Sequence, residues 1–172
     1  MTDTVKIEIE PLTAQAFAPF GLLLEPTWPA TFDLPEKNLH RFPWQADSPV
    51  IVQILEFKPQ PMIVRKIERH THVTESRMHI GGSSTIIVVA APSDAPPRAT
   101  DLRAFRLEGQ GVMFKAGTWH AVDAFPEGEE PGFFLFLSDR ETQRELFDDP
   151  VQHPTRSAFH DYVAGGQDVR IS

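Results

Sequence analysis

The sequence predicts a mainly β protein whose short antiparallel strands form a sandwich or a barrel. The 172 residues include 16 prolines against 10 glycines, and proline at that density disfavours long helices and favours short strands joined by turns. Short apolar segments recur along the chain, and turn-forming residues separate most of them. No long helical pattern alternates with these segments, so a βαβ fold is not expected.

The amino-terminal part is expected to form one strand and one short helix. Residues 5–9 alternate apolar and charged side chains, which predicts a strand with one face in water. Residues 13–18 predict a short helix, which Thr13 caps and which Pro19 and Gly21 end.

The middle of the chain holds most of the predicted strands. Residues 28–47 are proline-rich with mixed polarity, and they predict an irregular loop that could hold one short strand. After this loop, strands are expected at 50–57, 63–70, 85–91, 103–107, 112–115, 119–124 and 133–138. Residues 141–147 predict a second helix with Asp139 as its cap. The residues that follow it read as a tail that could pack on a neighbouring molecule.

These elements predict a single domain over residues 1–172. An amino-terminal strand and helix are expected within residues 5–20 and the barrel over about 48–140. The carboxyl-terminal helix and tail are expected over 141–172.

Composition and charge exclude several classes of partner. The net charge is −8 at pH 7 and the pI is about 5.3, which argues against a nucleic-acid surface and against adsorption to an anionic membrane. The chain has no cysteine, so disulfides, thiolate metal sites and cysteine nucleophiles are excluded. The first residues do not form a signal peptide, and the longest apolar run, 86–91, is too short to span a bilayer. We therefore expect a cytoplasmic protein.

Two histidines one residue apart carry the strongest functional pattern. Side chains alternate along a strand, so His70 and His72 are expected to point the same way, with Glu75 just beyond them. Two imidazoles and a carboxylate suit a first-row metal or an acid–base site. A His-x-His pair alone is also common at a polar strand edge. A second segment, residues 109–120, ends in His120 after a glycine turn, and it favours a site if the two segments meet in space.

Several short motifs then show, in their order and spacing, a resemblance to a known family. They are Ile9-Glu10-Pro11-Leu12-Thr13, Phe20-Gly21, Glu68-Arg69-His70, Ile86-Ile87-Val88-Val89-Ala90, Leu102-Arg103-Ala104-Phe105, Gln110-Gly111-Val112, Trp119-His120 and Asp139-Arg140. Over about residues 7–140 the chain resembles the ureidoglycolate lyases. This resemblance implies a cupin-type antiparallel β-barrel (a double-stranded β-helix or jelly roll) with a few short helices. It also implies cleavage of (S)-ureidoglycolate to glyoxylate and urea in allantoin and purine breakdown, and a homodimer.

The sequence departs from the family pattern in its pocket segments. Thr71-His72 stands where the family usually has a proline after the first histidine. Glu75 stands at a glutamine position and His79 at a proline position, and Ala121-Val122 follows the later histidine in place of His-Pro. Two alternatives to the lyase therefore stay open. One is a metal-dependent cupin enzyme that acts on another small carboxylic acid, and the other is a non-catalytic cupin that binds a small ligand.

Four residues are expected to carry the chemistry. His70, His72 and His120 are the expected ligands of a divalent transition metal, for which nickel, manganese, iron and zinc are all suitable. Glu75 could be a further ligand or an acid–base group, and we favour it as the base. His70 and His120 complete the expected catalytic set.

Three further residues are expected to bind a carboxylate substrate: Arg77, Lys115 and His79. Each of the two cations could equally be a solvated charge at a strand edge. Arg69 should face away from the histidines if its strand is regular. For the assembly we expect a homodimer with a buried strand-edge interface, to which residues 28–47 and the carboxyl-terminal tail could contribute. The alternative is a monomer whose own amino-terminal segment covers the edge.

Overall fold

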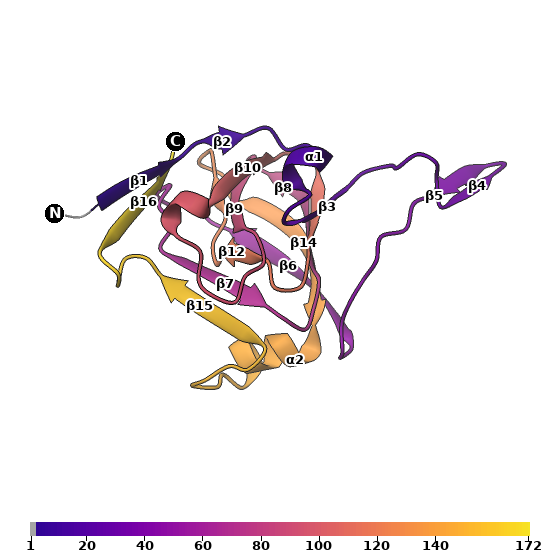
Figure 1. Cartoon of the computed structure of the whole chain (residues 1–172). Coiled ribbons are helices and arrows are strands. Elements are labelled where there is room, and N and C mark those ends of the chain that lie inside the picture. Colours follow the sequence, from indigo (N-terminus) through magenta and orange to yellow (C-terminus); the bar gives the residue numbers. More distant parts are fainter. Residues whose placement is uncertain (1–2) are drawn as a thin grey trace.

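Two mainly antiparallel sheets form the body of the protein (Figure 1). The computed structural model describes residues 3–172. The seven-stranded sheet runs in the order β15 (Ser157–Asp161), β7 (Lys66–His70), β12 (Trp119–Ala121), β9 (Thr85–Ala90), β10 (Arg103–Leu107) and β2 (Ile9–Glu10), with β13 (Phe125–Pro126) paired to β9. The five-stranded sheet runs β3 (Gly21–Leu24), β11 (Gly111–Phe114), β8 (Glu75–Gly82), β14 (Gly132–Asp139) and β6 (Val50–Phe57). The mainly β, cupin-type class is thereby confirmed, because sheets of short strands built this way are typical of jelly rolls.

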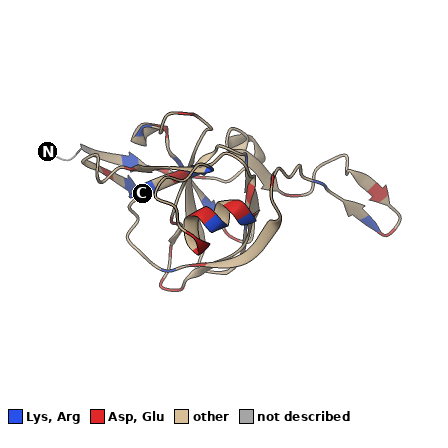
Figure 2. Ribbon diagram, turned by 90° about the horizontal axis from the view of Figure 1, so that it is seen from below, with Lys and Arg blue, Asp and Glu red and all other residues tan. Residues whose placement is uncertain are grey.

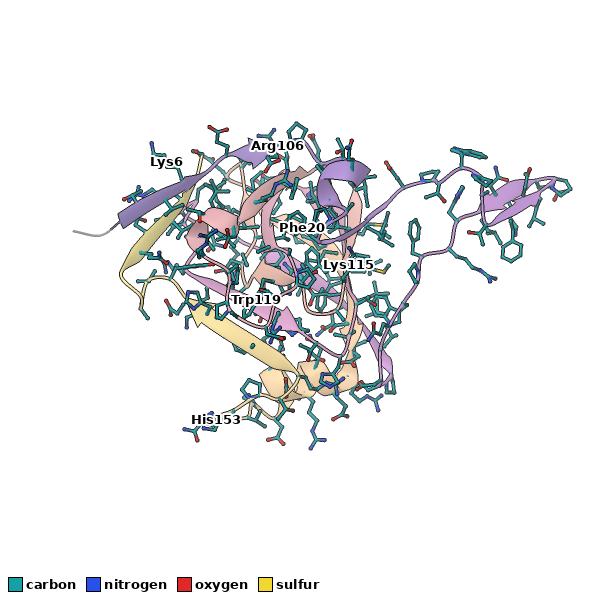
Figure 3. The ribbon with its side chains drawn as sticks, viewed as in Figure 1. Lys6, Phe20, Arg106, Lys115, Trp119 and His153 are labelled. Carbon is teal, nitrogen blue, oxygen red and sulfur yellow. The ribbon has the colours of Figure 1, made fainter. Side chains whose placement is uncertain are left out.

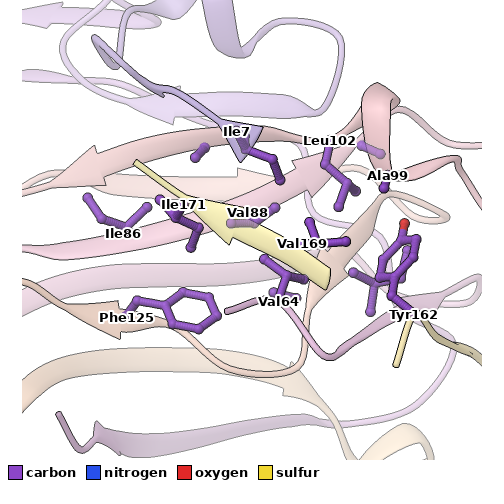
Figure 4. Close-up of a cluster of buried hydrophobic side chains, with 14 of the residues drawn as sticks. Ile7, Val64, Ile86, Val88, Ala99, Leu102, Phe125, Tyr162, Val169 and Ile171 are labelled. Atoms are coloured by element: carbon purple, nitrogen blue, oxygen red, sulfur yellow. The ribbon is translucent and has the colours of Figure 1, made fainter. Parts of the chain in front are cut away.

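A two-stranded ribbon covers the outer face of the seven-stranded sheet. Strand β1 (Asp3–Ile7) pairs in parallel with β16 (Gln167–Ile171), so the first and last strands of the chain lie side by side. Apolar side chains of this ribbon, among them Val169 and Ile171, belong to a buried cluster with Ile86 and Val88 of β9 (Figure 4). The carboxyl-terminal residues are therefore not the tail that the sequence predicted, because β15 and β16 are part of the sheets.

A second buried cluster joins the two sheets. Ile87 and Val89, on the other face of β9, pack there with Phe105, Phe114 and Phe134. Because β9 is buried on both faces, its sequence is a continuous apolar run instead of an alternating one.

The two predicted helices are present, and each has its predicted cap. In α1 (Ala14–Phe17) the backbone N–H of Ala16 donates to Oγ1 of Thr13, at 3.1 Å. In α2 (Arg140–Gln143) the N–H of Thr142 donates to Oδ1 of Asp139, at 2.9 Å. A π-helical turn, η2 (Arg144–Asp148), continues α2, and a short 3₁₀ turn, η1 (Ala99–Asp101), precedes β10. Within the described residues, no helix has the length and apolar character needed to cross a bilayer.

Residues 25–49, here called the arm, connect β3 to β6 and project away from the sheets. Two perpendicular views show the arm clear of the rest of the molecule (Figures 1 and 2). Its tip is a hairpin of β4 (Phe32–Leu34) and β5 (Lys37–Leu39), in which every residue is exposed. The sequence predicted one short strand in this region, and the structure has two.

Candidate functional site

One carboxylate and two imidazoles meet between the two sheets. The ligand atoms of Glu68, His70 and His120 all lie within 4.8 Å of one another. Glu68 and His70 are two residues apart on β7 and therefore share a face, and His120 on β12 pairs in register with Glu68. Oε1 of Glu68 lies 3.8 Å from Nε2 of His70 and 3.9 Å from Nδ1 of His120. The two histidine segments of the sequence thus meet in space.

His72, predicted as the third nitrogen ligand, lies outside this cluster. Strand β7 ends at His70, so the alternation of faces does not continue to His72. The His72 side chain is exposed, and its Nδ1 lies 2.9 Å from Oγ1 of Thr71. Glu68 takes the third position instead. The same alternation, followed two residues backward from His70, would have found it.

Strand β8 of the facing sheet adds a buried ion pair. Nε of Arg77 donates to Oε1 of Glu75 at 2.7 Å, and Nη2 of Arg77 lies 3.2 Å from Nδ1 of His120. Oε2 of Glu75 lies 3.5 Å from Nε2 of His70. Three aromatic rings surround the guanidinium, with centres 5.4–6.0 Å from its carbon: Phe57, Phe114 and Phe136. Glu75 and Arg77, both predicted as site residues, are therefore brought to the cluster.

The mutual charges of the cluster set the protonation of its members. Burial alone would raise the pKa of Glu68, but the two imidazoles and Arg77 lower it to about 2. Burial acts on Glu75 in the same way, and Arg77, followed by the imidazoles, holds its pKa below the ordinary value. Burial lowers the pKa of His120 to about 4. Burial would also lower the pKa of His70, but the two carboxylates raise it above the ordinary value.

The donor set fits a divalent transition metal. Two imidazoles and a carboxylate are a common ligand set for such ions and leave further coordination positions open. Nε2 of His120 is buried and finds no hydrogen-bond partner in the described part of the chain, and a cation would satisfy this nitrogen. Nδ1 of His70 lies 2.9 Å from Oγ of Ser157, a contact that orients the ring so that Nε2 faces the carboxylates. Glu68, His70 and His120 could therefore hold a metal.

Ser157 was not found from the sequence, because nothing near it suggests a site. It reaches His70 because β15 pairs antiparallel with β7, with these two residues in register. Only the long-range pairing of the carboxyl-terminal strand could have revealed it.

His79 and Lys115, predicted to bind substrate, are placed elsewhere. His79 donates from Nε2 to the carbonyl of Ser83 and accepts at Nδ1 from the N–H of Gly109, each at 3.0 Å. Both ring nitrogens of His79 therefore form hydrogen bonds with backbone groups. Lys115 is exposed, and its Nζ donates to the carbonyl of Ala18 at 2.7 Å (Figure 3). The turn after β11 carries Lys115 to the α1 side of the body, away from the cluster.

Arg69 faces away from the cluster, as its position on the strand predicted. Its guanidinium donates to the carbonyl of Ser93 and lies 5.2 Å from the centre of the Trp119 ring. Arg69 therefore has a structural role at the outer face of the sheet.

A cavity of about 340 Å³ opens beside the cluster. Its charged wall consists of Glu68, His70, Glu75 and Arg77. Six apolar side chains form much of the remainder: Leu55, Phe57, Val122, Phe136, Leu146 and Phe147. Two amides, those of Gln53 and Gln143, complete the lining. The volume is at the lower end of the range for small-molecule sites.

The fold and the site together define a cupin-type protein with a buried histidine–carboxylate centre beside a small cavity. Residues 4–154 match the ureidoglycolate lyase family. The ureidoglycolate lyase of Stutzerimonas stutzeri is 33% identical over an alignment of 169 positions, and the match covers 85% of this chain and 96% of that protein. The ureidoglycolate lyase of Pseudomonas syringae pv. tomato is 36% identical over an alignment of 124 positions, and the match covers 66% of this chain and 72% of that protein. This chain belongs to the ureidoglycolate lyase family.

Among solved structures, the chain is similar to a dTDP sugar isomerase from Desulfovibrio desulfuricans. The two superpose with a TM-score of 0.46 at 12% sequence identity, over 86% of this chain and 89% of that one.

Proposed function

We propose that this protein cleaves (S)-ureidoglycolate to glyoxylate and urea. The observation that carries the proposal is the buried Glu75–Arg77 pair, 2.7 Å apart, which lines a small cavity together with His70. The chain that holds it belongs to the ureidoglycolate lyase family. The proposal includes the role in purine breakdown and the cytoplasmic location expected from the sequence.

The reaction reverses the addition of urea to an aldehyde. A base removes the proton of the C2 hydroxyl group, the oxygen lone pair forms the carbonyl of glyoxylate, and the C2–N bond breaks. The electron pair of that bond goes to the urea nitrogen, which must receive a proton. One proton therefore moves from the hydroxyl oxygen to the leaving nitrogen, with no oxidant or reductant.

Glu75 is the proposed base and proton carrier. Its carboxylate accepts one hydrogen bond from Arg77, which keeps it charged and leaves the second oxygen, Oε2, toward the cluster. A carboxylate in this state can take the hydroxyl proton and then return it to the leaving nitrogen. Its burial excludes bulk water, which would otherwise compete for the proton.

Arg77 is the proposed binding group for the substrate carboxylate. A guanidinium has five N–H donors, and the hydrogen bond to Glu75 occupies only one of them. The remaining donors are held in a fixed plane by three surrounding phenylalanine rings. The guanidinium charge thereby offsets part of the repulsion between Glu75 and a second anion.

Glu68, His70 and His120 are the proposed ligands of a divalent nickel, manganese, zinc or iron ion. When bound, such an ion supplies Lewis acidity that stabilises negative charge on the substrate hydroxyl and carboxylate oxygens. The three protein residues are held for this role by their neighbours, Ser157 for His70 and the β7–β12 pairing for the other two.

Release of glyoxylate from ureidoglycolate by the purified protein tests the proposal. We expect turnover by the wild type, with a loss of about 10²- to 10⁴-fold in the Glu75→Gln variant, which keeps the shape but not the base. His72→Ala is the matched control and should keep full activity, because His72 lies outside the cluster. Glyoxylate release no faster than without protein would refute the substrate.

We also propose a homodimer in which the arm of each copy lies on the five-stranded sheet of the other. The ribbon of β1 and β16 covers the outer face of the seven-stranded sheet, but apolar side chains on the outer face of the five-stranded sheet are exposed. They are Leu22, Val50, Val52, Ile54, Met78 and Ile80. The arm exposes apolar side chains as well, namely Trp28, Phe32, Leu34 and Leu39. A two-fold exchange of arms would bury both sets at once.

A further inference from the structure

The cavity has two chemically different walls. Ionisable side chains gather at the end formed by β7 and β8, around Glu75 and Arg77. Apart from Gln53 and Gln143, the other lining side chains are apolar. A ligand that fits both walls carries its charge at one end and a neutral hydrogen-bonding group at the other.

Gln53 lies on the uncharged wall of the cavity, and the fold leaves its amide oxygen without a hydrogen-bond partner. Strand β6 alternates between exposed and half-buried residues, and Gln53 lies on its half-buried face with Leu55 and Phe57. Oε1 of Gln53 is shielded from solvent and finds no hydrogen-bond partner among residues 3–172. A buried amide oxygen without a partner costs free energy, so its retention points to a ligand that supplies the donor.

The spacing between Gln53 and Arg77 suits a small substrate. Both residues pair with Phe136 of β14, from opposite sides, so they stand in one row across three strands. Two strand spacings separate their backbones by about 10 Å. Their side chains extend toward the same cavity, and the remaining gap can be bridged by a molecule whose ends are roughly 6 Å apart. Ureidoglycolate, with a carboxylate at one end and a primary ureido group at the other, has this length.

Gln143 places a second amide on the same wall. It is the last residue of α2, it is 4% exposed, and it lines the cavity together with Gln53. An amide side chain carries both a donor and an acceptor, and rotation about its terminal bond presents either one. A ureido group likewise carries N–H donors and a carbonyl acceptor. Two glutamines can therefore pair with both functions of one ureido group.

We propose that Gln53 and Gln143 bind the ureido end of the substrate and determine specificity for a terminal NH₂ group, while Arg77 binds the carboxylate. This inference rests on the proposed function, and it adds the orientation of the substrate. Acids that lack the ureido group, such as glyoxylate, leave both glutamine side chains without a hydrogen-bond partner and therefore bind weakly.

The test compares two unreactive acids of equal size. N-carbamoylglycine ends in NH₂, and N-acetylglycine has a methyl group at the same place. We expect wild-type protein to bind N-carbamoylglycine about tenfold more tightly or better by calorimetry, because the methyl group leaves the amides unpaired. Gln53→Met and Gln143→Met, which keep the side-chain length, should each reduce the preference to about twofold or less while N-acetylglycine binds as before. The exposed Gln152→Met is the matched control and should keep the full preference.

Folding of each variant is checked by its melting temperature, and Gln53→Met should melt no lower than the wild type because it removes an unsatisfied buried oxygen. Equal binding of the two acids by the wild type, or an unchanged preference in both folded variants, would overturn the inference. In that case, turnover of ureidoglycolate by the wild type would still support the proposed function. Absence of turnover together with binding of neither acid would refute the proposed function and the inference with it.

Discussion

Arg77 and the backbone carbonyl of Ala121 require opposite protonation states of one nitrogen of His120. Nδ1 of His120 lies 3.2 Å from Nη2 of Arg77 and 3.2 Å from the carbonyl oxygen of Ala121. A guanidinium only donates, so the first contact requires a bare Nδ1, whereas the carbonyl only accepts and requires a protonated one. With its pKa lowered to about 4, the ring is neutral at pH 7 and carries a single proton. The tautomer that serves Ala121 leaves a lone pair on Nε2, which is the form a metal ligand needs.

Replacement of Arg77 is predicted to destabilise the fold through Glu75. The variant Arg77→Met leaves a fully buried carboxylate without its cation, which we expect to cost about 3–5 kcal/mol. Urea unfolding measures this cost. The double variant Arg77→Met with Glu75→Gln removes both charges and should recover most of the lost stability, but not the activity. A double variant as unstable as the single one would show that packing, and not the buried charge, is responsible.

Metal binding is predicted to depend on Glu68 and not on His72. Protein stripped with a chelator should rise in melting temperature when nickel, manganese, zinc or iron is added, because the ion binds only the folded site. His70→Ala, His120→Ala and Glu68→Ala should each abolish or strongly reduce that rise. His72→Ala should leave it unchanged, because His72 is exposed and lies beyond the end of β7. If His72→Ala abolishes the rise in melting temperature and Glu68→Ala does not, the metal ligands are those expected from the sequence, with His72 and without Glu68.

The sequence predicted strand positions well where patterns are local. The predicted strand 50–57 coincides with β6 and the predicted strand 103–107 with β10. Strand β8 is not among the strands that the sequence predicts, because its end, Gly81-Gly82, has the composition of a turn. Gly82 has a φ of +80°, and a Cβ there would clash with the carbonyl oxygen of Pro131, so this glycine serves a close strand approach.

The site was predicted only as far as local alternation applies. His70, Glu75, Arg77 and His120 were named from the sequence, and the structure brings them together. Their meeting depends on the pairing of strands that lie far apart in sequence, and no single-sequence pattern encodes such pairing.

The ion pair between Glu10 and Arg103 is predicted to give a small, pH-dependent stabilisation. Nε of Arg103 donates to Oε1 of Glu10 at 2.6 Å, and this hydrogen bond lowers the pKa of the carboxyl group below its ordinary value of 4.5, against the effect of burial. A lowered pKa means that the stabilisation is present above pH 4.5 and is lost as the pH falls through the lowered value. Both side chains are about one third exposed, so we expect less than about 1 kcal/mol, further weakened by salt.

Glu10→Gln tests this by urea unfolding at several pH values. The difference in unfolding free energy between wild type and variant should be positive at pH 7 and should shrink as the pH falls below 4.5 and through the lowered pKa of Glu10. A difference that grows on acidification would contradict the assignment.

The arm is predicted to hold two copies of the chain together. Light scattering at micromolar concentration should give twice the chain mass of 19.4 kDa. Exposed Val52 and Ile54 lie on the outer face of β6, an edge strand whose apolar side chains have no cover in the described residues. Covering this face with an apolar arm removes it from water and protects the sheet edge from nonspecific pairing.

Charge on either partner surface should separate the copies. Val52→Lys with Ile54→Lys on the sheet, or replacement of the hairpin residues 32–39 by a short glycine–serine linker, should each shift the mass to that of one chain without lowering the content of β structure. Val163→Lys is the matched control, because Val163 is about as exposed, at 55%, but lies in the turn between β15 and β16. A wild-type mass of one chain would refute the dimer. If the protein stays dimeric in both the sheet variant and the hairpin variant, the interface lies elsewhere. Neither of the two apolar surfaces would then be needed for the dimer.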